Sequence, residues 1–432
     1  MRITNTHKFF DSLLLFLLVM SGGGLLFVGS QRNEMSWVLF SLAIFVLVFM
    51  GTKIKKSIFN ASLFTLSVFL ALILANYIAA PHVEIMRGEH LNYLQYAFLF
   101  LNVTSCVLIL MHLKNNRESS YFLDRIHFIL KIVLYHALLS FLCYFFLKGY
   151  LIRLYGGWVD GGNEKYIADT FYYLFFYDAE KYKFSLFGVE FIRNQGCFWE
   201  PGILQIFLNI LLFIEGFVVK RNNWTIFLLI IAIITTYSTA GIVIMLILLF
   251  FIFWAYIRKN PLIIILALSV SFPLYYVAKT NIENKTTGER SSSFQKRYLD
   301  LVQPFAIASD YPITGVGLDR DYFRKLRSRF QMEDDFGQII QKYTGFERIS
   351  EETEKGSSNS LTYLMAAVGF PVALFLFYCL LKQNLFTKRK GIFMTIIIIS
   401  IFSEPLLLRP FFLILIVSGM MSIFNKYTIR KI

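Results

Sequence analysis

The chain has 432 residues, of which 56% are hydrophobic and only 16% are charged, and its mean hydropathy is +0.59. Soluble globular proteins are typically about 25% charged, so this composition excludes a water-soluble enzyme with one buried core, and its apolar content excludes a disordered chain. The formal net charge of +14 suggests an anionic partner. For a chain that lives in lipid we expect membrane lipid headgroups or an anionic substrate, and no nucleic acid.

Apolar stretches long enough to cross a bilayer follow one another along the chain. They predict an all-α polytopic membrane protein, with a single integral membrane domain over residues 1–432 and about twelve transmembrane helices, at 9–29, 35–51, 58–80, 91–112, 127–148, 200–218, 224–238, 240–257, 261–279, 360–381, 391–405 and 409–425. The stretches 224–257 and 391–425 have basic residues at both ends. Because short basic loops stay in the cytoplasm, each stretch should be a hairpin, and both chain termini should be cytoplasmic.

Two long loops are then extracytoplasmic, at about 148–198 and 280–358. Long translocated loops do not follow the positive-inside rule, so their basic residues point to a function. In the second loop, residues 320–330 read RDYFRKLRSRF, and helical spacing places Tyr322, Phe323, Leu326 and Phe330 on one stripe. We expect a short amphipathic helix that either lies on the outer leaflet or contacts the substrate.

Candidate site residues lie in these loops and at the ends of the helices beside them. Arg193 and Glu200 stand in RNQGCFWEPG, just before a predicted helix; Glu200 also suits a helix N-terminus, whereas an arginine at the mouth of a membrane bundle is a functional candidate. The further candidates are Arg290, Arg297, Gly315, Gly317, Asp319 and Arg320 in the second loop, Asn359 at the start of the next helix, and Glu404 and Arg409 at the last hairpin tip, where those two could also pair. The cysteines and histidines have no metal-binding or redox spacing, so no metal site is expected.

In their order along the chain, the motifs RNQGCFWEPG, TTYSTAG, YPITGVG, SSNSLTYLMAAVGFP and SEPLLLRPFF resemble those of the O-antigen polymerases (Wzy type), within the wider group of O-antigen ligase and polymerase membrane proteins. The resemblance implies a GT-C-like, metal-independent glycosyltransferase of the bacterial inner membrane that needs no cofactor. Its substrate would be oligosaccharide repeat units carried on undecaprenyl pyrophosphate, joined at the outer face. A chain-length regulator and a flippase of the same pathway are the further partners that it suggests.

The resemblance also implies roles for the candidate residues. Arg193 and Arg297 would stabilise the departing pyrophosphate, because guanidinium groups pair well with phosphate oxygens. Glu200 would accept the proton of the acceptor hydroxyl, with Asp319 and Glu404 as alternatives. Substrate contacts are expected from the remaining candidates: Arg290, Gly315, Gly317, Arg320, Asn359 and Arg409.

Two departures favour a polymerase over a ligase. The ligase branch places a histidine just before the asparagine that opens the helix at 360, and this chain has Ser358 there. Ligases also tend to carry an arginine after the serine of the hairpin tip, where this chain has Thr239. The alternatives that remain are an O-antigen ligase, a polymerase of capsule or exopolysaccharide, and a flippase for lipid-linked oligosaccharides. A flippase fits poorly because the predicted spans carry almost no charge at mid-membrane.

Overall fold

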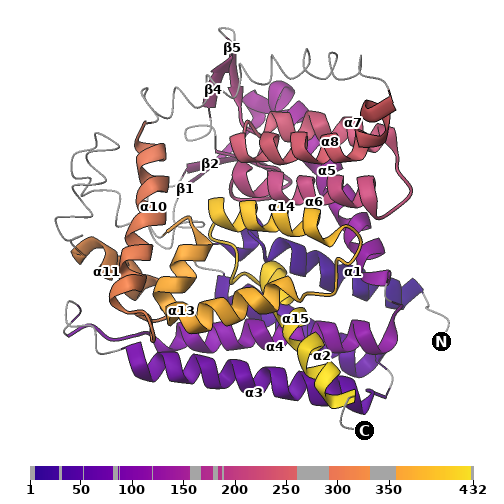
Figure 1. Ribbon diagram of the computed structural model, residues 1–432. Coiled ribbons are helices and arrows are strands. Elements are labelled where there is room, and N and C mark those ends of the chain that lie inside the picture. Colours follow the sequence, from indigo (N-terminus) through magenta and orange to yellow (C-terminus); the bar gives the residue numbers. More distant parts are fainter. Residues whose placement is uncertain are drawn as a thin grey trace.

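The computed structural model describes residues 5–28, 32–51, 53–80, 86, 88–118, 120–155, 167–178, 183–186, 189–259, 291–330 and 357–429. Helices dominate this part of the chain (Figure 1). The membrane-type helices are α1 (Asn5–Met20), α2 (Arg32–Met50), α3 (Lys56–Ala79), α4 (Tyr93–Asn116), α5 (Tyr121–Leu147), α6 (Pro201–Phe217), α7 (Asn223–Thr235), α8 (Thr239–Lys259), α13 (Ser360–Leu381), α14 (Lys390–Ser403) and α15 (Pro410–Ile429).

These helices correspond, within the described residues, to eleven of the twelve predicted spans, and the span at 261–279 lies outside the described residues. Six described helices are long and apolar enough to cross a membrane. Large apolar side chains such as Phe49 and Ile78 are exposed on their outer faces, as expected for lipid contact. The 13 residues of α7 extend only about 20 Å, less than the roughly 30 Å hydrocarbon core. The prediction of a multi-pass membrane protein is confirmed, whereas the number of twelve transmembrane helices stays a prediction.

The first described helix begins, and the last one ends, on the same side of the bundle (Figure 1). Two helices of the second long loop, α10 (Ser291–Asp310) and α11 (Arg320–Arg329), lie on the opposite side (Figure 1). The candidates on these two helices, Arg297 and Arg320, therefore lie on the side opposite to the beginning of α1 and the end of α15.

The first long loop contains β-structure that the sequence analysis did not predict. Strands β1 (Ile152–Tyr155), β2 (Ile167–Phe171) and β3 (Phe175–Tyr177) form one antiparallel sheet, and β4 (Lys183–Leu186) and β5 (Val189–Ile192) form a hairpin. Tyr172 and Tyr173 turn the chain between β2 and β3 with φ of 46° and 60°. The strands are short, so the described part of the chain remains mainly helical.

The first predicted span differs from the structure at its end. Helix α1 stops at Met20 instead of continuing to residue 29, because three glycines follow and Gly23 has φ of 134°, which a residue with a side chain rarely adopts. The chain then pairs with the segment before α6: the N–H of Trp199 donates to the carbonyl of Gly23, and that of Leu25 to Cys197, both at 3.2 Å. The RNQGCFWEPG segment is thus held by the N-terminal segment.

Helix α13 is kinked, and the YPITGVG segment fills the kink. Gly369 has non-helical angles (φ 76°) and Pro371 follows it, so the helix cannot supply an N–H to the carbonyl of Ala367. The N–H of Gly317 donates to that carbonyl at 2.9 Å, and the N–H of Val316 to Ala366 at 2.8 Å. Backbone carbonyls that lose their helical N–H donor inside a membrane must accept a hydrogen bond from another group. The motifs YPITGVG and SSNSLTYLMAAVGFP, which were recognised separately in the sequence, therefore form one structural unit.

Helix α11 forms as predicted, but its apolar stripe does not face the lipid. Tyr322, Phe323 and Leu326 are 3%, 1% and 0% exposed and pack in a cluster with residues of α3, α4 and α13. The interpretation of this helix as one that lies on the outer leaflet is therefore wrong. Its role is to fix the second loop on the helix bundle.

Candidate functional site

A buried ion pair connects the two helices of the second loop. Nη2 of Arg327 on α11 lies 2.9 Å from Oδ1 of Asp300 on α10, and both side chains are at most 1% exposed. Nε of Arg327 donates to Oε1 of Gln303 at 2.9 Å, and Gln303 Nε2 donates back to the carbonyl of Arg327 at 2.9 Å. Burial lowers the pKa of Arg327, and Asp300 opposes that shift. Because a buried charge without its partner is costly, this pair holds α10 and α11 in one arrangement.

The same aspartate binds the start of α13. Ser358 donates to Oδ2 of Asp300 from both its Oγ, at 2.6 Å, and its N–H, at 2.9 Å. The carbonyl of Asp300 accepts from Thr362 Oγ1 at 3.1 Å. Three segments therefore meet at one carboxylate: α10, α11 and the N-terminus of α13. Ser358 has its hydroxyl committed to this contact.

Arg297 lies one turn before Asp300 on α10 and reaches the tip of the last hairpin. Its Nη2 is 3.8 Å from Oε1 of Glu404, and the two side chains are 49% and 7% exposed. Of the predicted site residues, these two are brought together. An exposed cation beside a nearly buried carboxylate is an arrangement that can bind an anionic group and accept a proton from a neighbouring hydroxyl.

The hairpin tip that carries Glu404 is fixed on α13. Ser360 Oγ donates to the carbonyl of Glu404 at 2.7 Å and accepts from the N–H of Leu406 at 2.8 Å. The carboxylate itself lies against Gly202 in the first turn of α6, where a Cβ would overlap Oε1. Glu200 occupies the N-cap position of α6, and its side chain makes no capping hydrogen bond. Both predicted glutamates are therefore at the N-terminus of α6.

Arg193 supports the tip of the α7–α8 hairpin. Its Nε donates to the carbonyl of Thr236 at 3.0 Å. The neighbouring Asn194 also binds the tip, through its N–H to the carbonyl of Thr235 at 3.0 Å and through Nδ2 to Thr235 Oγ1 at 3.0 Å. The turn at Tyr237, with φ of 48°, separates α7 from α8 within the stretch 224–257, for which the sequence predicted a hairpin. These contacts give Arg193 a positioning role, and its contact with a substrate stays a prediction.

Four of the remaining candidates serve local structure. Gly315 and Gly317 have φ of 65° and 109°, and their N–H groups donate to the carbonyls of Tyr311 and Ala367, which leaves these groups nothing to offer a phosphate. Asp319 caps α11, accepting from two of its N–H groups through Oδ1 and from the N–H of Asn92 through Oδ2 at 2.7 Å. Asn359 caps α13 in the same way. Their contacts with a substrate also stay predictions.

Three candidates remain to be placed. Arg320 begins α11, and Arg409 donates from Nη1 to the carbonyl of Phe27 at 2.9 Å. Arg290 lies outside the described residues. Over the part of the chain that the structure describes, no three His, Cys, Asp or Glu side chains gather closely enough to hold a metal ion.

Sequence reasoning missed Asp300 and Arg327, although a signal for each was present. Arg327 follows Phe323 by four residues, so helical spacing puts it on the same face as the apolar stripe. Asp300 stands between Leu299 and Leu301, in the apolar middle of its helix. An isolated charge on each of two apolar helix faces in one loop predicts that the two charges pair.

The comparison with protein families bears on this part of the molecule. Residues 224–377 match the model of the O-antigen ligase family. The match supports the O-antigen ligase and polymerase group. It covers roughly a third of the chain, and includes α10, α11 and the start of α13, where Asp300, Arg327 and Ser358 meet. No curated protein matches the chain. Together with the apolar helices long enough to cross a membrane, the match supports a membrane protein of surface-polysaccharide biosynthesis.

Proposed function

We propose that this protein is an O-antigen polymerase. It joins oligosaccharide repeat units carried on undecaprenyl diphosphate at the outer face of the bacterial inner membrane, with both of its termini in the cytoplasm. The observation that carries the proposal is the contact between Arg297 and Glu404, 3.8 Å from Nη2 to Oε1. It brings a cation for the leaving diphosphate and a carboxylate for the attacking hydroxyl to one place, on the side of the bundle opposite to the chain ends.

The transfer needs one bond to break and one to form. The bond between the anomeric carbon of the growing chain and the diphosphate oxygen breaks, and undecaprenyl diphosphate leaves with the electron pair. The hydroxyl oxygen of the incoming repeat unit bonds to the same carbon, and its proton passes to a carboxylate. Arg297 stabilises the negative charge that develops on the diphosphate. The diphosphate is already a good leaving group, so the proposal requires no metal or cofactor.

Glu200 and Glu404 are the two carboxylates proposed as the proton acceptor. Glu404 is beside Arg297 and against the first turn of α6, while Glu200 immediately precedes that turn. Asp319, the third carboxylate considered from the sequence, has both oxygens occupied by backbone N–H groups. It is therefore the weakest of the three as a base.

Ser358 favours the polymerase over the ligase within the proposal. The ligase branch is expected to use a histidine at this position as its base. Here the Ser358 hydroxyl donates to Asp300 at 2.6 Å, so it contributes to the position of α13 and offers no basic group. The proton acceptor then has to come from another segment, as the placement of Glu404 allows.

Deletion of the gene in the native host tests the proposal. Loss of a polymerase leaves a single repeat unit on the lipid A core, whereas loss of a ligase or of a flippase leaves no repeat unit at all. Loss of a polymerase for capsule or exopolysaccharide leaves the O-antigen ladder intact and removes the other polymer. Complementation with the wild-type gene should restore the ladder. A ladder of normal length in the deletion strain would refute the proposal.

A further inference from the structure

Three helices that begin near the candidate site, α6, α8 and α13, end together on the opposite side of the bundle. Lys388, which precedes α14, donates from Nζ to the carbonyl of Val218 after α6, at 2.9 Å. Nη2 of Arg221 donates to the hydroxyl of Tyr256 in the last turn of α8, at 3.4 Å, and α14 packs against both α6 and α8. These contacts join three segments into one surface: 218–223, 253–259 and 382–390.

This surface carries a dense group of cations. The basic patch has six members, of which Arg221 is half-buried and the others are exposed: Lys220, Arg221, Arg258, Lys259, Lys388 and Arg389. The three segments contain no aspartate or glutamate. Within the part of the chain that the structure describes, none of the six side chains forms an ion pair.

Helix stability does not explain the cations that precede α14. Lys388, Arg389 and Lys390 stand at its N-terminus, where the helix dipole disfavours positive charge. Arg389 has φ of 48° and makes no side-chain capping hydrogen bond, although asparagine or glycine suits such a backbone better. The positive-inside rule explains why a single short loop is basic, but it does not require separate basic loops to meet. An anionic ligand would explain why they do.

Exposed aromatic side chains border the basic patch. Trp224, Trp254 and Tyr256 are 64%, 48% and 53% exposed, and tryptophan and tyrosine gather where lipid headgroups meet the hydrocarbon core. The guanidinium group of Arg221 lies over the rings of Phe253 and Tyr256, at 5.2 and 5.5 Å from their centroids. The basic patch therefore lies at the level of the headgroups, with apolar surface beside it.

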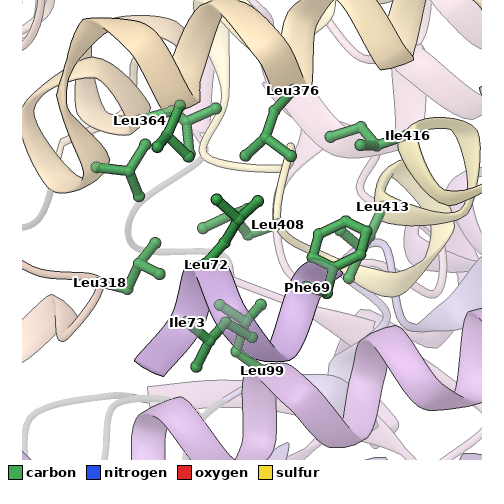
Figure 2. A pocket seen from close by; sticks show the side chains of 12 residues that line it. Phe69, Leu72, Ile73, Leu99, Leu318, Leu364, Leu376, Leu408, Leu413 and Ile416 are labelled. Atoms are coloured by element: carbon green, nitrogen blue, oxygen red, sulfur yellow. The ribbon is translucent and has the colours of Figure 1, made fainter. Parts of the chain in front are cut away.

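The outer surface of the bundle, and not its interior, offers space for the chains of a lipid bound there. The cavity between α3, α4, α13 and α15 has about 30 Å³ and apolar walls, with Phe69, Leu376 and Ile416 among its lining residues (Figure 2). It has room for about one or two water molecules, whereas pockets for small molecules have roughly 300 Å³ or more. Close to the basic patch, α8 instead exposes Phe250 and Phe251.

We propose that the basic patch binds the phosphate groups of an anionic phospholipid, in the leaflet on the side of the chain ends. Lysine and arginine pair with phosphate oxygens, and basic clusters between membrane helices suit anionic headgroups. An acidic protein surface would also be attracted by the charge, but the bordering aromatic side chains favour a lipid. The inference goes beyond the proposed function, because the basic patch and the candidate site lie at opposite ends of α6, α8 and α13.

Lipid binding by the purified full-length protein tests this inference. Native mass spectrometry measures the affinity of the wild type for cardiolipin and for phosphatidylethanolamine. We expect cardiolipin to bind about tenfold more tightly or better, and salt to reduce the difference. The patch variant combines Lys220→Gln, Arg258→Gln and Arg389→Asn. Its affinity for cardiolipin should fall about tenfold or more, because each cation near the headgroups contributes roughly fivefold.

The control removes the same number of charges from another basic segment on the side of the chain ends. It combines Lys53→Gln, Lys55→Gln and Lys56→Gln, which replace three exposed lysines, and it should bind cardiolipin like the wild type. If the patch variant does not fold, Lys220→Gln alone takes its place, with an expected loss of about fivefold.

Four outcomes would overturn the proposal. They are equal affinity of the wild type for both lipids, wild-type affinity for cardiolipin in the patch variant, and an equal loss in the patch variant and the control. The fourth is a polyglutamate peptide that binds the wild type more tightly than cardiolipin does, and the patch variant not at all, which would assign the surface to an acidic protein. None of these measurements involves polymerisation, so their results are independent of the proposed function.

Discussion

Arg327 and Asp300 pair at 2.9 Å, between Nη2 and Oδ1, inside the protein and away from solvent. Both residues belong to a loop, yet they are as buried as the middle of the helix bundle. Because Arg297 precedes Asp300 by one helical turn, the pair determines where Arg297 lies relative to Glu404. The pair is thus a structural requirement of the candidate site, although neither residue is expected to contact the substrate.

Arg327→Met should destabilise the protein strongly. It leaves the Asp300 carboxylate buried without its cation, which typically costs about 3–5 kcal/mol. The measurement is the thermal unfolding midpoint of the purified protein in detergent. The double variant Asp300→Asn with Arg327→Met should recover part of the loss, because no unpaired charge remains. Arg324→Ala, on the exposed face of α11, should unfold close to the wild type. A wild-type midpoint for Arg327→Met would show that the pair contributes little.

Arg297→Ala should reduce the O-antigen ladder to one repeat unit while the protein still inserts in the membrane. Its side chain is 49% exposed, so the loss is in the reaction and not in folding. Arg297→Lys should restore the ladder only partly, since lysine lacks the planar fork of arginine. Gel electrophoresis of the polysaccharide reports the result, with the amount of protein measured in the same cells. The control is again Arg324→Ala, and full-length ladders from Arg297→Ala would refute the role in diphosphate binding.

Arg193→Ala is also expected to reduce the O-antigen ladder to one repeat unit. Two effects contribute: a displaced α7–α8 tip and the loss of any contact between Arg193 and the diphosphate. The variant loses the hydrogen bond from Nε to the carbonyl of Thr236, which is worth about 1.5–3 kcal/mol for a charged donor. The two contributions separate in kinetics on the purified protein: a lost substrate contact changes turnover with an unchanged unfolding midpoint, whereas a lost support lowers both. A normal ladder from this variant would remove Arg193 from the site.

Gly315→Ala should prevent the second loop from docking on α13. Its φ of 65° costs a residue with a Cβ roughly 1–2 kcal/mol, and the added carbon would overlap the backbone of Ala367. We expect a lower yield of folded protein and a lower unfolding midpoint. Gly149→Ala is the matched control, because a Cβ there meets nothing within 4 Å. If the two variants behave alike, the docking of the YPITGVG segment in the α13 kink is not needed for stability.

The sequence predicted the helices well because hydropathy alone determines most of them. A hairpin within residues 224–257 was predicted from the basic residues at both ends of that apolar stretch, and the structure has a turn there, between α7 and α8. The predicted end of α1 was wrong, because the observed end depends on the pairing of Gly23 with Trp199, and these two residues are far apart in the sequence. The short strands of the first loop were missed for another reason: segments of three to five residues are too short to show a clear alternation of apolar and polar side chains.

The candidate site was harder to predict, since charge and position in a loop do not reveal partners. Arg297 and Glu404 were selected separately, and only the packing of the last hairpin on α13 through Ser360 brings them together. Asn359 was selected as a sugar contact, whereas its side chain caps a helix.

Reconstitution of the transfer tests the central claim most directly. The purified protein is placed in liposomes with one substrate, the undecaprenyl-diphosphate-linked repeat unit, and with no lipid A core. The account predicts a ladder of two, three and more repeat units on the lipid, with one undecaprenyl diphosphate released for each bond formed, and no ladder with Arg297→Ala. Products that stay at one repeat unit, and that lengthen only when a lipid A core acceptor is added, would contradict it.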